Sequence, residues 1–126
     1  MNDRKKILVM DDSALVLEAT AIVLEQNGFA VVAVQNLTAL EAACTQSTPD
    51  LFVLDVQMPE IFGDDVGQVL REVRKMKVPI ILFSSIPESD LVERTREAAL
   101  DGYVSKSDGL DALVRCVASL IGPGRA

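Results

Sequence analysis

Residues 51–65 read LFVLDVQMPEIFGDD, and this stretch places an acidic residue where an apolar run ends. Four apolar residues at 51–54 lead straight into Asp55, and a segment with Pro59 and Gly63, typical of a loop, follows. A strand in which every residue is apolar is expected inside a parallel sheet that is covered on both faces. Asp55 is therefore predicted at the carboxyl end of a central strand.

The rest of the chain alternates apolar runs with segments of helical period. Runs at 7–10, 30–34 and 79–83, and a shorter one around Tyr103, predict four more strands. Helical spacing is shown by Leu15, Ala19, Ile22 and Val23, by Val66, Val69, Leu70 and Val73, and by Leu110, Leu113, Val114 and Val117. Thr38-x-x-Glu41 predicts a capping box for the helix after the second strand. Strict alternation predicts an α/β fold with a parallel sheet and helices on both faces.

Length and composition indicate one cytoplasmic domain. A chain of 126 residues has the usual size of a single domain, placed at 1–121, with GPGRA at 122–126 as a loose tail. No apolar run is long enough for a membrane span and no secretory signal is recognisable, so no membrane contact is expected. A net charge of −7 with scattered basic residues argues against nucleic acid as a partner. Cys44 and Cys116 lack metal-ligand spacing and are expected to be small buried apolar residues.

Polar candidates for a site follow four of the five predicted strands. Asp11 and Asp12 follow the first strand, and Asp55 follows the third. Ser84 follows the fourth strand and Lys106 the fifth. Taken alone, each has an ordinary explanation as a helix cap, a turn residue or a surface side chain. Because ligands of open α/β sheets bind at the carboxyl ends of the strands, we expect all five residues in one crevice.

The residue types in that crevice limit its chemistry. Two carboxylates about 4 Å apart repel by about 4 kcal/mol at an effective dielectric constant of about 20, so a cation is expected among the three aspartates. Oxygen ligands alone, in a chain without histidine, suit Mg²⁺. Lys106 and Ser84 add a positive charge and a hydrogen-bond donor, which together indicate phosphoryl transfer. Asp55 is the better candidate for the carboxylate that accepts the phosphoryl group.

Four motifs resemble those of one known family: ILVMDDS at 7–13, LDVQMPEIFG at 54–63, PIILFSS at 79–85 and YVSK at 103–106. They are similar to the motifs of response regulator receiver domains of two-component signalling, including the single-domain chemotaxis type. The resemblance implies a flavodoxin-like doubly wound (βα)5 fold, with a five-stranded parallel sheet of order 2-1-3-4-5. It also implies a phosphoprotein that takes up a phosphoryl group and loses it slowly, rather than a turnover enzyme.

The resemblance implies a role for each acidic residue. Asp55 would be the phosphoacceptor and also a ligand of Mg²⁺. Asp12 would bind the ion directly, and Asp11 would bind it mainly through water. The backbone carbonyl of Gln57 would complete the metal ligands that the protein supplies.

The remaining implied roles concern a conformational switch. Lys106 would pair with the phosphoryl group, Ser84 would turn inward to hydrogen-bond to it, and Tyr103 would follow. This movement would reshape the face made by the fourth helix, fifth strand and fifth helix, which would contact a downstream protein target. The phosphodonor would be a histidine kinase or a histidine phosphotransfer protein. The helix expected at 90–100 has few apolar positions, so little buried area holds it in place.

Several positions depart from the family pattern. Ser107 follows Lys106 where family members usually have proline, and Ser85 stands where alanine is usual. Gln57 and Ile86 occupy the two variable positions that tune dephosphorylation in such domains. Because the apolar Ile86 cannot orient a water molecule, a long phosphoryl lifetime is predicted.

Two alternative functions are weighed against this one. An Mg²⁺-dependent phosphatase or phosphotransferase with an aspartate nucleophile needs an acid–base carboxylate two residues later, where Gln57 stands. The other alternative is a degenerate receiver that acts as a phosphorylation-independent interaction module. The serine after Lys106 keeps this second alternative open, whereas the complete set of strand-end residues argues against it.

Overall fold

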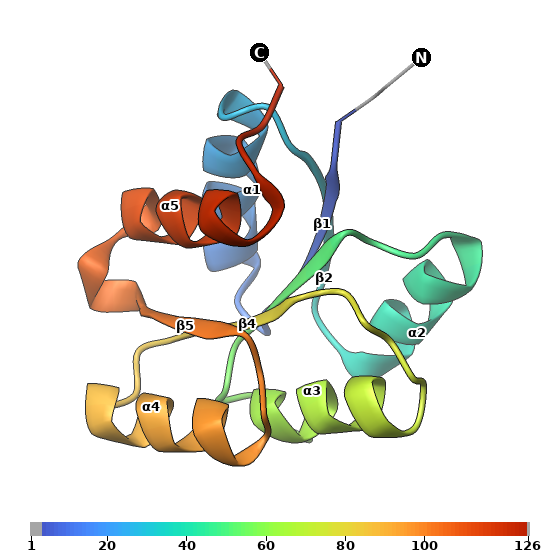
Figure 1. Cartoon of the computed structure of the whole chain (residues 1–126), viewed down its shortest axis with the longest axis vertical. Helices are drawn as coiled ribbons and strands as arrows, with labels where there is room; N and C mark the ends of the chain where they lie inside the picture. Colours follow the sequence, from blue (N-terminus) through green and yellow to red (C-terminus); the bar gives the residue numbers. More distant parts are fainter. Residues whose placement is uncertain (1–3, 126) are drawn as a thin grey trace.

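The computed structural model describes residues 4–125 as five strands that alternate with five helices (Figure 1). In chain order the elements are β1 (Lys6–Met10), α1 (Ala14–Gln26), β2 (Ala30–Val34), α2 (Leu37–Gln46), β3 (Leu51–Leu54), α3 (Gly63–Glu72), β4 (Ile80–Ser84), α4 (Glu88–Glu97), β5 (Gly102–Ser105), a short 3-10 helix η1 (Lys106–Asp108) and α5 (Leu110–Ile121). All strand pairs are parallel and the order is β2-β1-β3-β4-β5, as predicted. The strand that precedes Asp55 is therefore the central one.

Strand residues alternate between two apolar clusters, one on each face of the sheet. Figure 1 shows α1 and α5 on one side of the sheet and α2, α3 and α4 on the other. The α1/α5 cluster contains Ile7, Val9, Leu17, Leu24, Leu51, Val53, Ile81, Leu113 and Val117. The α2/α3/α4 cluster contains Leu8, Met10, Leu40, Phe52, Leu54, Val66, Leu70, Ile80, Leu82 and Leu91. Burial on both faces explains why the central strands are apolar at every position.

Two helices begin earlier than their sequence signals suggest. The capping box at Thr38 is wrong: α2 starts at Leu37, and the Asn36 side chain caps it by accepting the N–H of Ala39 at 2.8 Å. An asparagine oxygen accepts a free N–H at the helix start as a threonine oxygen would, and here it does so two residues earlier in the chain. Helix α4 begins at Glu88 rather than at residue 90, and Leu91 is the one fully buried side chain among its residues.

The residues after α5 are not a loose tail, contrary to the prediction for 122–125. The N–H of Arg125 donates to the carbonyl of Gly28 at 3.0 Å. Gly28 has a φ of +90°, and a Cβ on it would lie 2.0 Å from the carbonyl oxygen of Arg125. Glycine at this turn therefore provides both the backbone conformation and the space for the returning chain. Residue 126 lies outside the described residues.

Neither a membrane segment nor a disulfide appears among residues 4–125. None of the helices formed by these residues combines the length and the apolar character that crossing a membrane demands. Cys44 in α2 and Cys116 in α5 are free thiols, and both are half-buried rather than fully buried. Burial raises the pKa of each of these thiols, which makes them poorer nucleophiles at neutral pH.

Candidate functional site

The parallel register brings the candidate residues to one edge of the sheet. Met10 and Leu54 are paired at the ends of β1 and β3, so Asp11 and Asp55 follow at the same level. Ser84 and Ser105 are paired at the ends of β4 and β5, which places Lys106 directly after that level. The crevice expected from the sequence therefore exists at the carboxyl edge of the sheet.

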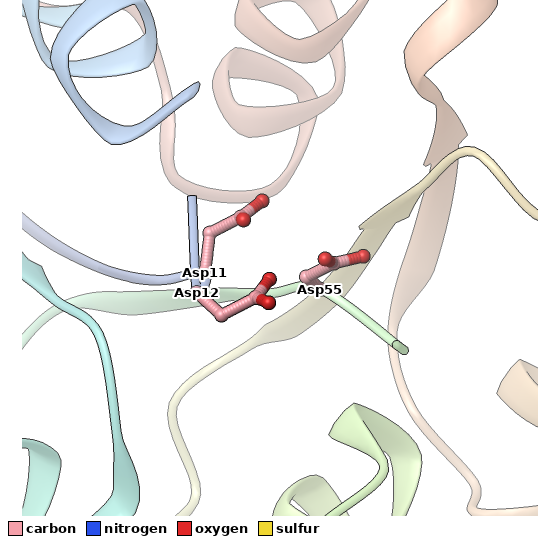
Figure 2. Close-up of side chains that lie close together, drawn as sticks. All are labelled: Asp11, Asp12 and Asp55. Atoms are coloured by element: carbon pink, nitrogen blue, oxygen red, sulfur yellow. The ribbon is translucent and has the colours of Figure 1, made fainter. Parts of the chain in front are cut away.

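Three carboxylates form the centre of this crevice (Figure 2). Asp11, Asp12 and Asp55 each offer one carboxylate oxygen, and these oxygens all lie within 4.8 Å of one another. Asp11 and Asp55 are buried, with 2% and 6% of their surfaces exposed, whereas Asp12 is exposed to solvent. Oxygen ligands that are partly open to water fit the coordination of Mg²⁺, which keeps several of its waters. The donor set therefore suits this ion.

Lys106 supplies the positive charge among these carboxylates. Its Nζ donates to Oδ2 of Asp11 at 2.7 Å and lies 3.4 Å from Oδ2 of Asp55. The same Nζ lies 5.8 Å from the centroid of the Phe83 ring, within the range of a cation–π contact. The lysine thus offsets part of the repulsion between the two buried carboxylates.

The loop around Lys106 is held by serine hydroxyls. Ser105 Oγ accepts the N–H of Ser107 at 3.3 Å and lies 2.8 Å from the hydroxyl of Ser107. A proline after Lys106 would have no N–H to donate here. The chain therefore fixes this turn by hydrogen bonds that the usual proline would not allow.

The first loop of the site serves the acidic cluster and α1 together. Ser13, rather than Asp12, is the N-cap of α1, and its Oγ accepts the N–H of Val16 at 3.3 Å. Oδ1 of Asp11 accepts the N–H of Ser13 at 2.9 Å. The carboxylate of Asp12 is consequently not used for capping and faces solvent beside the other two.

The environment of Asp55 disfavours its negative charge. Burial raises the pKa of the Asp55 carboxyl, the negative charge of Asp11 raises it further, and Lys106 and Ser84 act in the opposite direction. Oδ1 of Asp55 accepts the N–H of Val56 at 2.8 Å. Oδ2, which faces Lys106, is the oxygen that carries no backbone hydrogen bond.

The raised pKa predicts a pH-dependent effect of Asp55→Asn on stability. Above the folded-state pKa the wild type holds an unfavourable charge that the variant lacks, so the variant should be more stable at neutral pH, by a few degrees or about 1 kcal/mol in a domain of this size. Below the unfolded-state pKa both states bind the proton, and the difference should disappear. Thermal unfolding of the metal-free proteins across this pH range checks it, with Glu18→Gln as an exposed control. A difference that did not shrink on acidification would contradict it.

Ser84 and Gln57 lie at this edge of the sheet, whereas Tyr103 lies within β5, two residues before its end. Ser84 is fully buried, and its Oγ accepts the N–H of Ile86 at 3.4 Å. Tyr103 is half-buried on β5 and packs against the α2/α3/α4 cluster. It also lines a hollow of about 480 Å³ between α4, β5 and α5. Gln57 is exposed in the loop after Asp55 and forms a backbone bridge with Phe62.

One group of residues near the site was not predicted from the sequence. Nη1 of Arg94, in α4, donates to both carboxylate oxygens of Asp64, in the first turn of α3, at 3.0 and 3.2 Å. The guanidinium carbon of Arg94 lies 4.9 Å from the ring centroid of Phe62. Arg94 and Asp64 are 30 residues apart, and no spacing pattern in the sequence connects them.

Comparison with known proteins gives this architecture a family. A family model described as the response regulator receiver domain matches residues 7–118. The alkaline phosphatase synthesis transcriptional regulatory protein SphR of Synechococcus elongatus is 38% identical over 126 residues, which cover 91% of this chain and 48% of SphR. The polar-differentiation response regulator DivK of Brucella anthropi is 25% identical over 120 residues, which cover 94% of this chain and 97% of DivK. The chain thus spans about half of the first relative and nearly all of the second.

Solved structures show the same fold. The chemotaxis protein CheY4 of Vibrio cholerae superposes with a TM-score of 0.84 at 19% identity, over 93% of this chain and 98% of CheY4. A CheY-like receiver domain protein of Methanospirillum hungatei gives a TM-score of 0.82 at 20% identity, over 93% of each chain. The family match, the curated relatives and the fold agree, and the chain therefore belongs to the response regulator receiver domains, the phosphoacceptor modules of two-component signalling.

Proposed function

We propose that Asp55 of this receiver domain takes a phosphoryl group in an Mg²⁺-dependent reaction and that this event switches a protein-binding face. The observation that carries the proposal is the position of Lys106 Nζ between Oδ2 of Asp11 and Oδ2 of Asp55, at 2.7 and 3.4 Å. A fixed positive charge beside the acceptor oxygen stabilises the negative charge of the transferred group. It also opposes the rise in the pKa of Asp55 that burial causes, and so favours the nucleophilic carboxylate.

The transfer has a simple balance of bonds. Oδ2 of Asp55 attacks phosphorus, because Oδ1 is occupied by the N–H of Val56. The bond between phosphorus and the leaving group breaks, and its electrons stay on a histidine nitrogen or on acetate, depending on the donor. Asp55 then carries an acyl phosphate. Its hydrolysis returns the carboxylate and inorganic phosphate, so the domain is a switch and not a turnover enzyme.

The acidic cluster would hold the metal ion. Asp12 would be the direct ligand, since its carboxylate faces solvent and has no capping role. Asp55 and the backbone carbonyl of Gln57 would complete the set, and Asp11, already paired with Lys106, would act mainly through water. Mg²⁺, when bound, neutralises charge on the phosphoryl oxygens.

A mass measurement tests this function. The protein is incubated with acetyl phosphate and Mg²⁺, and its intact mass is followed. We expect one added phosphoryl group, which is lost when a chelator removes the ion before the incubation. A folded wild-type protein that binds Mg²⁺ but gains no mass would contradict the proposal and favour the phosphorylation-independent module.

The proposed switch uses Ser84 and Tyr103. The hydroxyl of Ser84 would leave the N–H of Ile86 and donate to a phosphoryl oxygen. Tyr103 would then move inward, and the hollow that it lines between α4, β5 and α5 would change shape. A downstream protein target in the cytoplasm would bind this face in one of its two forms.

The phosphodonor would be a histidine kinase or a histidine phosphotransfer protein. Helix α1, which starts beside Asp11, carries Leu15 with 76% of its surface exposed, and Ile22 two turns later is exposed as well. Between α1 and the Lys106 loop lies a hollow of about 180 Å³ lined mainly by apolar residues. An exposed apolar surface beside the acceptor supports docking of a protein donor there.

The identity of residue 86 should set the phosphoryl lifetime. Ile86 is half-buried after β4 and packs against the α2/α3/α4 cluster, so it offers no polar group to a water that attacks phosphorus. Ile86→Glu is expected to shorten the lifetime about tenfold or more, because a carboxylate can orient that water. Intact mass measured at intervals after removal of acetyl phosphate gives the lifetime, and Ile86→Met is the matched apolar control. Equal lifetimes for the Glu and Met variants would refute this role.

Neither alternative function is favoured by the site. A degenerate receiver would be expected to have lost part of the set formed by Asp11, Asp12, Asp55, Ser84 and Lys106, and all five lie at one edge here. The serine after Lys106 does not leave its loop without a fixed turn, because Ser105 accepts the N–H of Ser107. A phosphatase with an aspartate nucleophile would need an acid–base carboxylate two residues after Asp55, and Gln57 at that position cannot supply one.

A further inference from the structure

Arg94 joins α4 to the segment that follows Asp55. Its guanidinium makes two hydrogen bonds to the carboxylate of Asp64 and lies over the ring of Phe62. The side chain of Asp64 is 14% exposed and that of Arg94 is 35% exposed, so the ion pair is partly shielded from water. A single guanidinium nitrogen, Nη1, contacts both carboxylate oxygens, and the guanidinium plane also covers the Phe62 ring, so the arginine has two different partners on this segment.

Phe62 and Asp64, the partners of Arg94, lie on a segment whose backbone contacts that of the phosphoacceptor Asp55. Phe62 is the N-cap residue of α3, and the next residue, Gly63, donates its N–H to the carbonyl of Val56 at 3.0 Å. A Cβ on Gly63 would lie 1.8 Å from the carbonyl oxygen of Asp55, so the two backbones are in direct contact. The path from Asp55 to Phe62 and Asp64 therefore runs through backbone contacts, without an intervening flexible side chain.

Helix α4 packs against β4 and β5 but buries few side chains there. Leu91 is its one fully buried side chain, and Thr95 bonds back to the carbonyl of Leu91 within the same helix. The ion pair of Arg96 with Glu93 also stays within α4. A helix with so little buried apolar area opens or shifts at low cost, so a single contact to a neighbouring element has a large share in its position.

We propose that Arg94 is a positioning residue that couples α4 to the loop after Asp55. Its contact with Asp64 and Phe62 holds α4 in the arrangement seen here and opposes the change that phosphorylation brings about. The inference rests on the proposed function, since it concerns the regulation of the same site. Removal of the contact raises the fraction of unphosphorylated molecules that sample the switched arrangement, and these molecules accept a phosphoryl group more readily.

The test compares Arg94→Gln with Arg96→Gln, two arginines on the same helix that differ in whether their partner lies on α3 or on α4. Hydrogen exchange of the α4 amides in the unphosphorylated protein measures how readily this helix opens. We expect exchange to quicken about threefold to tenfold in Arg94→Gln and to change little in Arg96→Gln. Asp64→Asn should reproduce the effect, and the double variant with Arg94→Gln should add little to either single change.

Two further measurements separate coupling from a merely structural role. Tyr103 is the one tyrosine in a chain without tryptophan, so the intrinsic fluorescence reports this residue alone. In Arg94→Gln the fluorescence before phosphorylation should move toward the phosphorylated value, and phosphorylation by acetyl phosphate should be about threefold to tenfold faster. Arg94→Lys keeps the charge but not the planar group over Phe62, and should restore part of the wild-type rate.

Two results would contradict the proposed role of Arg94. Unchanged hydrogen exchange in Arg94→Gln would overturn it, because α4 would then be held by other contacts. Faster exchange with an unchanged phosphorylation rate and unchanged Tyr103 fluorescence would also overturn it, since the contact would be structural only. If the wild type took up no phosphoryl group, the proposed function would fail, and hydrogen exchange of the unphosphorylated variants would still decide whether Arg94 holds α4 in place.

Discussion

Asp55→Asn is expected to abolish the uptake of phosphoryl groups from acetyl phosphate. An amide oxygen is a poor nucleophile, and Oδ2 of Asp55 is the one acceptor oxygen that faces Lys106 at 3.4 Å. The variant keeps the size of the side chain and removes the charge that burial disfavours, so it should fold at least as well as the wild type. Intact mass after incubation with Mg²⁺ and acetyl phosphate measures the loss.

The chemistry of the adduct provides the control for this prediction. The phosphoryl group on the wild type should be released by hydroxylamine, which cleaves an acyl phosphate and leaves a phosphate ester intact. A mass gain in Asp55→Asn would contradict the assignment of Asp55. Resistance of that gain to hydroxylamine would point instead to a hydroxyl acceptor, such as Ser84 at the end of the neighbouring strand β4 or Ser85 directly after it.

Lys106→Met is expected to slow phosphorylation by about a hundredfold to a thousandfold, the usual cost of removing one charged or hydrogen-bonding group from a transition state. It should also destabilise the metal-free protein, because the buried carboxylates of Asp11 and Asp55 lose their shared cation, a loss on the order of 3 kcal/mol for a buried pair. Mg²⁺ should restore part of that stability by supplying another positive charge. Rates with acetyl phosphate and denaturant unfolding with and without Mg²⁺ measure both effects.

A matched control distinguishes this effect from a general loss of charge. Lys77→Met removes an equal charge from an exposed position in the loop before β4 and should leave both rate and stability nearly unchanged. If Lys106→Met were phosphorylated as fast as Lys77→Met, the lysine would have no part in the transfer. If its stability were unchanged without Mg²⁺, the ion pairs with Asp11 and Asp55 would contribute little to the fold.

Most of the fold was accessible from the sequence because each central strand carries a strong local signal. The run at 51–54 coincides with β3, since a strand buried on both faces has no polar position that could blur its limits. The run at 30–34 coincides with β2, an edge strand that is only partly buried but apolar at every position. The gathering of Asp11, Asp55 and Lys106 at one edge followed from parallel pairing alone, because all strands of such a sheet end on the same side.

Features that depend on distant contacts were not accessible. The start of α2 was misplaced because Asn36 and Thr38 are both good N-cap residues. Which of them caps the helix depends on the backbone conformation between the end of β2 and the start of α2. The packing of 122–125 required knowledge that Gly28 presents a bare carbonyl to the returning chain. Arg94 and Asp64 carry no mutual signal, since only the fold brings α4 beside the first turn of α3.

The hydrogen bonds near the two chain ends have a practical consequence for biophysical work on this domain. Lys5 accepts the N–H of Ala30 at 2.9 Å, and Arg125 donates to Gly28 at 3.0 Å, so both ends of the described chain meet the start of β2. The aspartates lie at the opposite ends of the strands. An affinity handle or surface anchor on either terminus therefore leaves the phosphoacceptor facing the bulk solution. One immobilised sample could then report the binding of donor and target in turn.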